Sequence, residues 1–193
     1  AMDIKEGDQL IQAKISNGED SIIMATKDGK SIRFEEKQVR PTGRRTKGVR
    51  GIMLASNDEV IGMLIAKREG TVLVTSENGY GKRSLLDEYR VQSRGGKGVY
   101  TMKKTPKTGQ LVTILETTDD DDLMIITNAG VMIRQKVDLI RVIGRNTQGV
   151  KLIRLDDGSK ISSVTKVIND DNENETEEDQ TRPNEESQTS SDE

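Results

Sequence analysis

Short apolar runs separated by polar turn residues recur along the chain. Residues 22–26 (IIMAT), 72–76 (VLVTS) and 124–127 (MIIT) are rich in β-branched residues, and the tripeptides KDG, ENG and NAG follow them. Gly, Asn and Asp tolerate the positive φ that a tight hairpin turn requires. A second run (SIRF, GKRS, MIRQ) begins one residue after each of these tripeptides. The pattern therefore predicts three β-hairpins, and the segments that follow them (EEKQV, LLDEY, KVDLI) are too short for stable helices.

The three hairpins belong to an internal repeat. Residues 22–49, 72–99 and 123–150 align without a gap over 28 positions, which corresponds to a period of about 50 residues. The positions that coincide are Gly29, Gly79 and Gly130; Arg33, Arg83 and Arg134; Arg40, Arg90 and Arg141; Arg44, Arg94 and Arg145; and Gly48, Gly98 and Gly149.

Further apolar stretches complete each repeat. One kind corresponds at 60–65, 111–115 and 161–167, with a partial match at 10–13, and a final strand is expected at 49–54, 99–103 and 150–155. About four strands in a repeat of about 50 residues is typical of a propeller blade. We therefore predict an all-β, propeller-like array over residues 1–168, made of three repeats and a partial fourth. Three blades are fewer than the roughly four to eight that close a ring, so the array is either open or lacks blades.

Charge divides the chain into two parts. Residues 169–193 contain eleven Asp or Glu, one Arg and no Val, Ile, Leu, Met or aromatic residue. Such a segment cannot bury apolar surface, so it is predicted to be a disordered acidic tail. The preceding 168 residues carry 29 Lys and Arg against 22 Asp and Glu, a net charge of +7. The whole-chain charge of −3 therefore hides a basic body.

Composition excludes several kinds of enzyme. The chain has no His and no Cys, which rules out Ser-His-Asp and Cys-His catalysis, thiolate or imidazole metal sites and disulfides. The run from Asp119 to Asp122 lacks the rest of a calcium loop, so no metal or cofactor site is expected. A carboxylate-based enzyme is a weak alternative. No apolar run approaches the roughly 20 residues that span a bilayer, and the sequence predicts a soluble, cytoplasmic protein.

A basic loop with the pattern Arg-x-x-x-Gly precedes the last strand of each repeat, at 44–48, 94–98 and 145–149. Arg and Lys side chains bind phosphates, and a rigid repeat scaffold arranges them in a regular row. The DNA backbone is a matching row of anions. Aromatic residues on which single strands could stack are few: Phe34, Tyr80, Tyr89 and Tyr100. The hypothesis is duplex DNA binding with weak sequence preference, against the alternatives of solvated loop charges and of a protein-binding scaffold.

Two stretches resemble a known family. Residues 77–99 and 126–155 are similar to the C-terminal domain of the A subunit of bacterial DNA gyrase, and the acidic tail fits. The most specific match is QSRGGKG at 92–98, which resembles the family's Gln-Arg-Arg-Gly-Gly-Lys/Arg-Gly box with Ser93 in place of a basic residue. The paralogous topoisomerase IV protein is the closest alternative.

The resemblance implies a β-pinwheel, in which neighbouring blades exchange strands, and a non-catalytic part of a type II DNA topoisomerase that wraps DNA to support negative supercoiling. The expected partners are double-stranded DNA and the rest of the gyrase A and B subunits, with ATP and Mg²⁺ acting elsewhere in the parent enzyme. Domains of this family commonly have six blades, so the chain corresponds to the C-terminal half, and the tail is expected to compete with DNA for the basic surface.

The resemblance also assigns roles to the basic residues and box glycines. The residues expected to grip the DNA backbone are Arg94, Gly95, Gly96, Lys97 and Gly98. Those expected to extend the DNA path are Arg44, Arg45, Lys47 and Arg145. Those expected on an outer rim, or as caps of blade edges, are Arg33, Lys82, Arg83 and Arg134.

Overall fold

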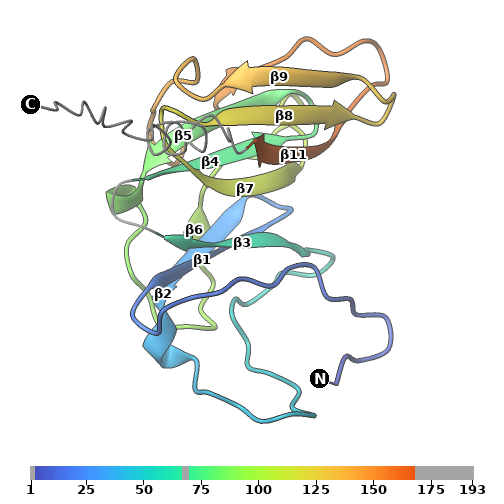
Figure 1. The fold of residues 1–193 in the computed structure, drawn as a ribbon. Helices are drawn as coiled ribbons and strands as arrows, with labels where there is room; N and C mark the ends of the chain where they lie inside the picture. Colours follow the sequence, from blue (N-terminus) through green and yellow to red (C-terminus); the bar gives the residue numbers. More distant parts are fainter. Residues whose placement is uncertain (1–2, 67–69, 168–193) are drawn as a thin grey trace, which may run out of the picture.

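A computed structural model describes residues 3–66 and 70–167, and these residues form strands and turns with two short 3-10 helices (Figure 1). The strands are β1 (Ser21–Thr26), β2 (Lys30–Glu35), β3 (Val60–Ala66), β4 (Thr71–Ser76), β5 (Tyr80–Leu85), β6 (Val99–Tyr100), β7 (Leu111–Thr117), β8 (Asp122–Thr127), β9 (Met132–Lys136), β10 (Val150–Lys151) and β11 (Ile161–Val167). The 3-10 helices are η1 (Glu36–Gln38) and η2 (Leu86–Glu88). The predicted all-β fold is confirmed.

The strands form three antiparallel sheets, one for each repeat. Their orders are β3-β1-β2-β6, β10-β5-β4-β7 and β11-β8-β9. Each sheet contains a predicted hairpin: β1 with β2, β4 with β5, and β8 with β9. In the first two sheets the hairpin forms the two central strands. The strands β3, β7 and β11 contact one another from sheet to sheet and lie one above another in Figure 1. We call the edge of each sheet formed by β3, β7 or β11 its inner edge, because β7 contacts both β3 and β11. The opposite edge, formed by β6, β10 or β9, is the outer edge.

Neighbouring blades exchange strands. Strand β6 belongs to the second repeat but pairs with β2 of the first, with Ser31 opposite Val99. Strand β10 of the third repeat pairs in the same way with β5 of the second, with Gly81 opposite Val150. Each repeat therefore completes the sheet of the one before it, as a pinwheel requires.

The two ends of the array lack this exchange within the described residues. Strand β9 has a partner on one side only, so the third sheet has three strands. Residues 49–54, which correspond to the exchanged segments, form no strand, and Val49 is 42% exposed. The prediction of a strand at 49–54 is wrong because residues 3–66 and 70–167 contain no earlier sheet that it could join. The predicted final strands at 99–103 and 150–155 are shortened to two residues each.

The partial fourth repeat is also not observed as a strand. Residues 10–13 have no regular structure, although Gln12 Oε1 accepts a hydrogen bond from the amide of Met63 at 2.8 Å. Leu10 and Ile15 are 65% and 98% exposed. The segment contacts the free side of β3 without a sheet of its own, and so does not extend the array. The predicted acidic tail lies outside the described residues.

Buried side chains pack within and between the blades. One cluster joins the first two sheets through residues such as Ile23, Leu64 and Val74, and a second joins the last two through Leu73 and Leu123. Tyr89 lies in the first cluster, is 1% exposed and shares a 2.6 Å hydrogen bond with Thr101. Burial raises the pKa of Tyr89 to about 12, so its hydroxyl stays protonated. Tyr89 therefore packs in the core where the first two blades meet.

Candidate nucleic-acid interface

The glycine loops lie over the outer edges of the sheets. Residues 91–98 run alongside β2 and form a β-bridge between Val91 and Arg33. Residues 142–149 run alongside β5 in the same way, with a bridge between Val142 and Arg83. We call the outer surface formed by loops 39–50, 90–98 and 141–149 the perimeter. The loop at 39–50 has no preceding sheet to cover in the part of the chain that the structure describes, and most of its residues are exposed.

Two glycines of the basic loops, Gly98 and Gly149, permit the strand exchange. Gly98 and Gly149 have φ of +68° and +78°, a conformation that L side chains rarely adopt. A Cβ at Gly98 would lie 2.4 Å from Ser31 O, and one at Gly149 would lie 2.7 Å from Gly81 O. Both glycines thus let the loop backbone approach the outer strand of the preceding blade.

The outer-rim prediction is wrong for Lys82 and Arg83. Lys82 is fully buried and Arg83 is 4% exposed, because both side chains point into the contact with the next repeat. Arg83 Nε donates to Ile140 O at 2.8 Å, and its Nη1 forms an ion pair with Asp119. The equivalent Arg33 is partly buried, and its Nη1 donates to Leu86 O at 3.2 Å. These side chains join consecutive repeats, which is the blade-edge role.

Arg134 occupies the same position at the open end of the array. Its side chain is 56% exposed, and it bonds to Asp122 through Nε at 2.8 Å and Nη2 at 2.6 Å. Arg94 and Arg145 are partly buried and donate to backbone carbonyls of the preceding repeat. By contrast, Arg44, Arg45 and Lys47 are exposed. Lys97 is exposed as well.

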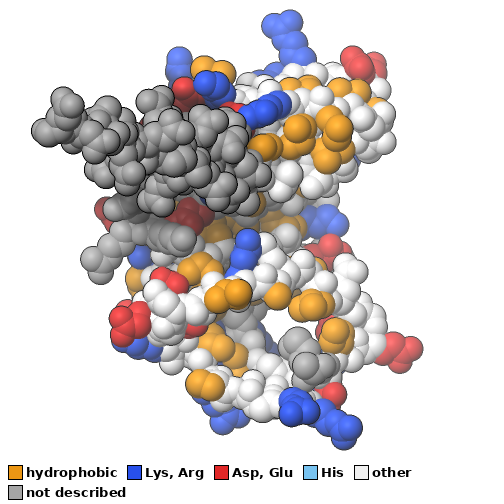
Figure 2. Space-filling view, in the orientation of Figure 1, with side chains coloured by type: hydrophobic (Ala, Val, Ile, Leu, Met, Phe, Trp, Pro, Cys, Tyr) orange, Lys and Arg blue, Asp and Glu red, His pale blue; other side chains and the backbone are white. Residues whose placement is uncertain are grey.

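One row of exposed cations was missed by the choice of sequence candidates. Arg40, Arg90 and Arg141 occupy equivalent positions just after η1, η2 and the turn at 137–140, and all three are exposed. The sequence signal was present, because the three residues coincide in the repeat alignment. Figure 2 shows Lys and Arg side chains at the lower end of the molecule, where the loop at 39–50 turns in Figure 1. The perimeter thus carries one such exposed Arg for each repeat.

Lys82 donates hydrogen bonds to the loop at 141–149 in the third repeat. Its Nζ donates to Gly144 O at 2.7 Å, to Arg145 O, and to Thr147 Oγ1 at 3.2 Å. The residue in the equivalent position of the first repeat is Ile32, which is also fully buried. Burial lowers the pKa of Lys82 to about 8, although the charge of Glu88 acts in the opposite direction.

This environment predicts a pH-dependent difference between the protein and a Lys82→Ile variant. Between the folded pKa of about 8 and the ordinary value of 10.5, the unfolded chain binds more protons at Lys82 than the folded chain does. The protein should therefore gain free energy of unfolding relative to the variant as the pH rises from 8 towards 10.5. Urea unfolding of both chains across this range measures the difference, and two parallel stability curves would contradict the prediction.

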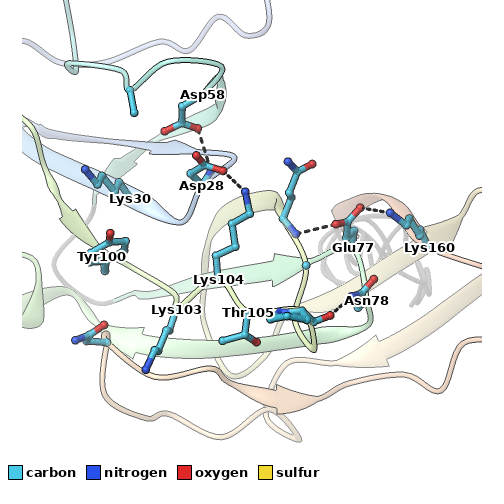
Figure 3. Close-up of a pocket in the computed structure, with 15 residues that line it drawn as sticks. Asp28, Lys30, Asp58, Glu77, Asn78, Tyr100, Lys103, Lys104, Thr105 and Lys160 are labelled. Carbon is cyan, nitrogen blue, oxygen red and sulfur yellow. Dashed lines mark hydrogen bonds and ion pairs between the residues drawn. The ribbon is translucent and has the colours of Figure 1, made fainter.

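An open cleft of about 1340 Å³ lies between the hairpin turns of the first two blades and the loop at 101–110 (Figure 3). Two ion pairs cross this region: Lys104 with Asp28, and Lys160 with Glu77 at 2.7 Å. Burial alone would raise the pKa of Glu77, but hydrogen bonds from Lys160 and the Gln110 amide outweigh it and lower the pKa. A carboxylate that stays ionised and paired is poorly suited to general acid catalysis, so the cleft gives the carboxylate-enzyme alternative no support.

Residues 3–66 and 70–167 contain no group of acidic residues arranged to hold a metal ion. They also contain no helix with the length and hydropathy needed to cross a membrane.

Comparison with known proteins places these features in a family. The sequence family described as "DNA gyrase C-terminal domain, beta-propeller" matches residues 20–67, 70–118 and 121–168, one match for each structural repeat. The chain belongs to this family. Each match begins two residues before one of the three blocks that align in the sequence.

Individual relatives of the chain are A subunits of DNA gyrase. The chain is 46% identical over 180 residues to the A subunit of DNA gyrase from Staphylococcus aureus strain MRSA252, and this alignment covers 92% of the chain and 20% of the relative. The same protein from strain NCTC 8325 gives 45% over 182 residues, with 93% and 20% covered. The chain thus spans about a fifth of the length of these curated relatives.

Solved structures show the same fold. The C-terminal domain of DNA gyrase A superimposes with a TM-score of 0.80 at 27% identity, over 86% of this chain and 57% of that one. The C-terminal domain of DNA topoisomerase IV gives the same TM-score at 23% identity, over 86% and 52%. Structure alone therefore does not separate the two paralogues, whereas sequence identity favours gyrase.

Proposed function

We propose that the chain binds and wraps double-stranded DNA along its perimeter, as a non-catalytic part of a gyrase that introduces negative supercoils. The observation that carries the proposal is the recurrence of an exposed arginine at the same outer position in every repeat: Arg40, Arg90 and Arg141. Membership in the gyrase C-terminal family supports it. Lys97 and the exposed cations Arg44, Arg45 and Lys47 extend the same surface.

The mechanism follows from the spacing of charge. Each cation that neutralises a phosphate releases counterions, so affinity comes from the DNA backbone and needs no base contacts. A curved row of cations favours DNA that bends along it, because the additional phosphates that the bend brings within reach offset its elastic cost. The perimeter would therefore hold a bent duplex with little regard to sequence.

The parent enzyme supplies what this chain lacks. In the proposal, strand cleavage and ATP hydrolysis with Mg²⁺ take place in other parts of the gyrase A and B subunits, in the cytoplasm. The chain itself needs no cofactor to bind DNA. The acidic segment at 169–193 would compete with phosphates for the perimeter, so deleting it should tighten DNA binding.

A salt series tests the phosphate contacts. The affinity of a labelled duplex is measured from about 50 to 200 mM salt for the chain and for the triple variant Arg40→Gln, Arg90→Gln and Arg141→Gln. Each lost phosphate contact should reduce the log-log slope by about 0.9, so the variant should lose about 2.7. The same salt series run without residues 169–193 tests the tail.

A charge-matched control separates position from net charge. Lys27, Lys160 and Lys166 are each in an ion pair with a carboxylate and lie outside the perimeter loops. Changing these three to Gln removes the same charge, and the slope should fall by less than one contact. Equal losses in the two triple variants would refute the perimeter as the DNA path, and no binding by the tailless chain near 50 mM salt would refute the function.

Relaxation of a closed circular plasmid in the presence of the chain tests wrapping, because a wrapped duplex leaves a change in linking number.

A further inference from the structure

We propose that Arg94 and Arg145 are positioning residues: they hold the glycine loop of one repeat against the preceding repeat, and neighbouring cations make the phosphate contacts. This inference rests on the proposed DNA binding. It reverses the role expected for the box arginine, which the sequence resemblance assigns to gripping the DNA backbone. A positioning role and a direct phosphate contact predict different effects of substitutions at Arg94.

The contacts of Arg94 show how the loop is held. Its Nε donates to Gln38 O at 3.0 Å and its Nη1 to Arg50 O at 2.6 Å, both in the first repeat. In return, Gln38 Oε1 accepts a hydrogen bond from the Arg94 amide at 2.7 Å. The adjacent Gly95 amide donates to Gly51 O at 2.7 Å. Four hydrogen bonds thus connect two adjacent loop residues to a segment about 50 residues earlier in the chain.

Arg145 repeats this arrangement one blade further on. Its Nε donates to Glu88 O at 3.0 Å, its Nη1 donates to Tyr100 O, and its amide donates to Glu88 Oε2 at 2.5 Å. Glu88 and Tyr100 are the repeat equivalents of Gln38 and Arg50. The same three bonds therefore occur at equivalent positions of two repeats, whether the accepting side chain is the amide of Gln38 or the carboxylate of Glu88. They are a property of the repeat.

The first repeat provides the internal comparison. Arg44 has the same place in the sequence pattern, but its loop has no preceding repeat within the described residues, and Arg44 is exposed. Arg94 and Arg145 are partly buried instead. The partly buried, hydrogen-bonded arrangement therefore depends on the preceding blade and not on the loop sequence alone.

The bonding of the guanidinium groups fixes their orientation. Nε and Nη1 of each group donate to backbone carbonyls of the preceding repeat, which uses two of its five N–H donors and holds the guanidinium plane against that repeat. Lys97 lies three residues after Arg94 and is exposed, and Arg90 lies four residues before it and is exposed too. We call the four hydrogen bonds of Arg94 and Gly95 the clamp. The clamp fixes the loop backbone that carries Lys97, and so holds Lys97 in place for the DNA.

Substitutions that keep or remove the charge distinguish positioning from contact. Arg94→Lys keeps the charge but cannot reproduce the planar two-carbonyl bridge, and Arg94→Met removes both. Gln38→Ala breaks the loop bond without changing any charge. If Arg94 positions the loop, all three should lower duplex affinity and the salt slope, by about the 0.9 that Lys97→Gln removes.

A double-mutant cycle completes the test. For a positioning role, adding Arg94→Met to Lys97→Gln should give no further loss of slope, because the same contact is already gone. Faster amide exchange at Gly95 and Gly96 should accompany each clamp variant and be absent from Lys97→Gln. Direct contact would instead leave Arg94→Lys and Gln38→Ala like the unchanged chain and give an additive loss of about 1.8 in the double variant. That result would overturn the proposal.

The control on the underlying function is the unchanged chain. If it shows no salt-dependent duplex binding, the proposed function fails, and this inference fails with it before any variant is compared. If it binds and the clamp variants bind equally well, the positioning role alone is refuted. Circular dichroism melting of every variant, with binding measured well below each transition, keeps unfolding from imitating loss of the loop.

Discussion

Gly98→Ala is expected to lower the free energy of unfolding by about 3–5 kcal/mol, at the upper end of what single substitutions do. The left-handed φ of +68° alone should cost a residue with a Cβ about 1–2 kcal/mol. The added carbon would also stand 2.4 Å from Ser31 O and 3.3 Å from Ile52 Cδ1. Because the first contact is with strand backbone, relief requires that β6 move away from β2. Urea unfolding measures the change.

Gly158→Ala is the matched control for this prediction. Gly158 has φ of +79°, but a Cβ there would meet nothing within 4 Å. This variant should therefore show only the conformational cost of about 1–2 kcal/mol. An equal loss in the two variants would mean that the exchanged strand yields to the Cβ, and that the close approach of β6 to β2 contributes little to stability.

Arg83→Met is expected to destabilise the chain by about 2–3 kcal/mol, since hydrogen bonds to charged groups contribute about 1.5–3 kcal/mol each. The variant keeps an apolar stem in a site that is 4% exposed, but it leaves Ile140 O without the 2.8 Å bond from Nε. The Asp119 side chain is 76% exposed, so water solvates its carboxylate in the variant and no unpaired charge is left buried.

Arg90→Met serves as the control for Arg83→Met, because Arg90 is exposed on the perimeter. Its loss should change the free energy of unfolding by less than about 0.5 kcal/mol. Equilibrium unfolding of both variants, together with amide exchange at Ile143, whose amide donates to Arg83 O at 2.9 Å, tests the contact between the second and third repeats. A loss no larger than that of Arg90→Met would show that main-chain bonds suffice to join the repeats.

Most of the fold could be predicted because local chemistry is repeated. Turn residues and β-branched runs specify the hairpins, and three aligned copies reveal the blade. The predicted strands at 60–65, 111–115 and 161–167 appear within one or two residues as β3, β7 and β11. The strand at 49–54 failed for a non-local reason: its sequence is that of an exchanged strand, but the sheet that it would join is absent from the described residues.

The candidate interface was harder to predict, because a basic residue in a repeat can face either the neighbouring blade or the solvent. Spacing and charge do not distinguish Lys82, which is fully buried, from Lys97, which is exposed. Arginine also bonds well to carbonyls, so its recurrence indicated an important position without indicating its partner. Arg40, Arg90 and Arg141 recur in the same way and face outward, which only the folded arrangement reveals.

The strand exchange has a consequence for the order in which the molecule is made. A ribosome releases the chain from its N-terminus, and β1, β2 and β3 emerge well before Val99 and Tyr100, which complete their sheet. The first blade must therefore wait, with an open edge on β2, until half of the second repeat has been synthesised. Nascent chains arrested before residue 100 should thus remain more sensitive to protease than chains arrested just after this strand has left the exit tunnel.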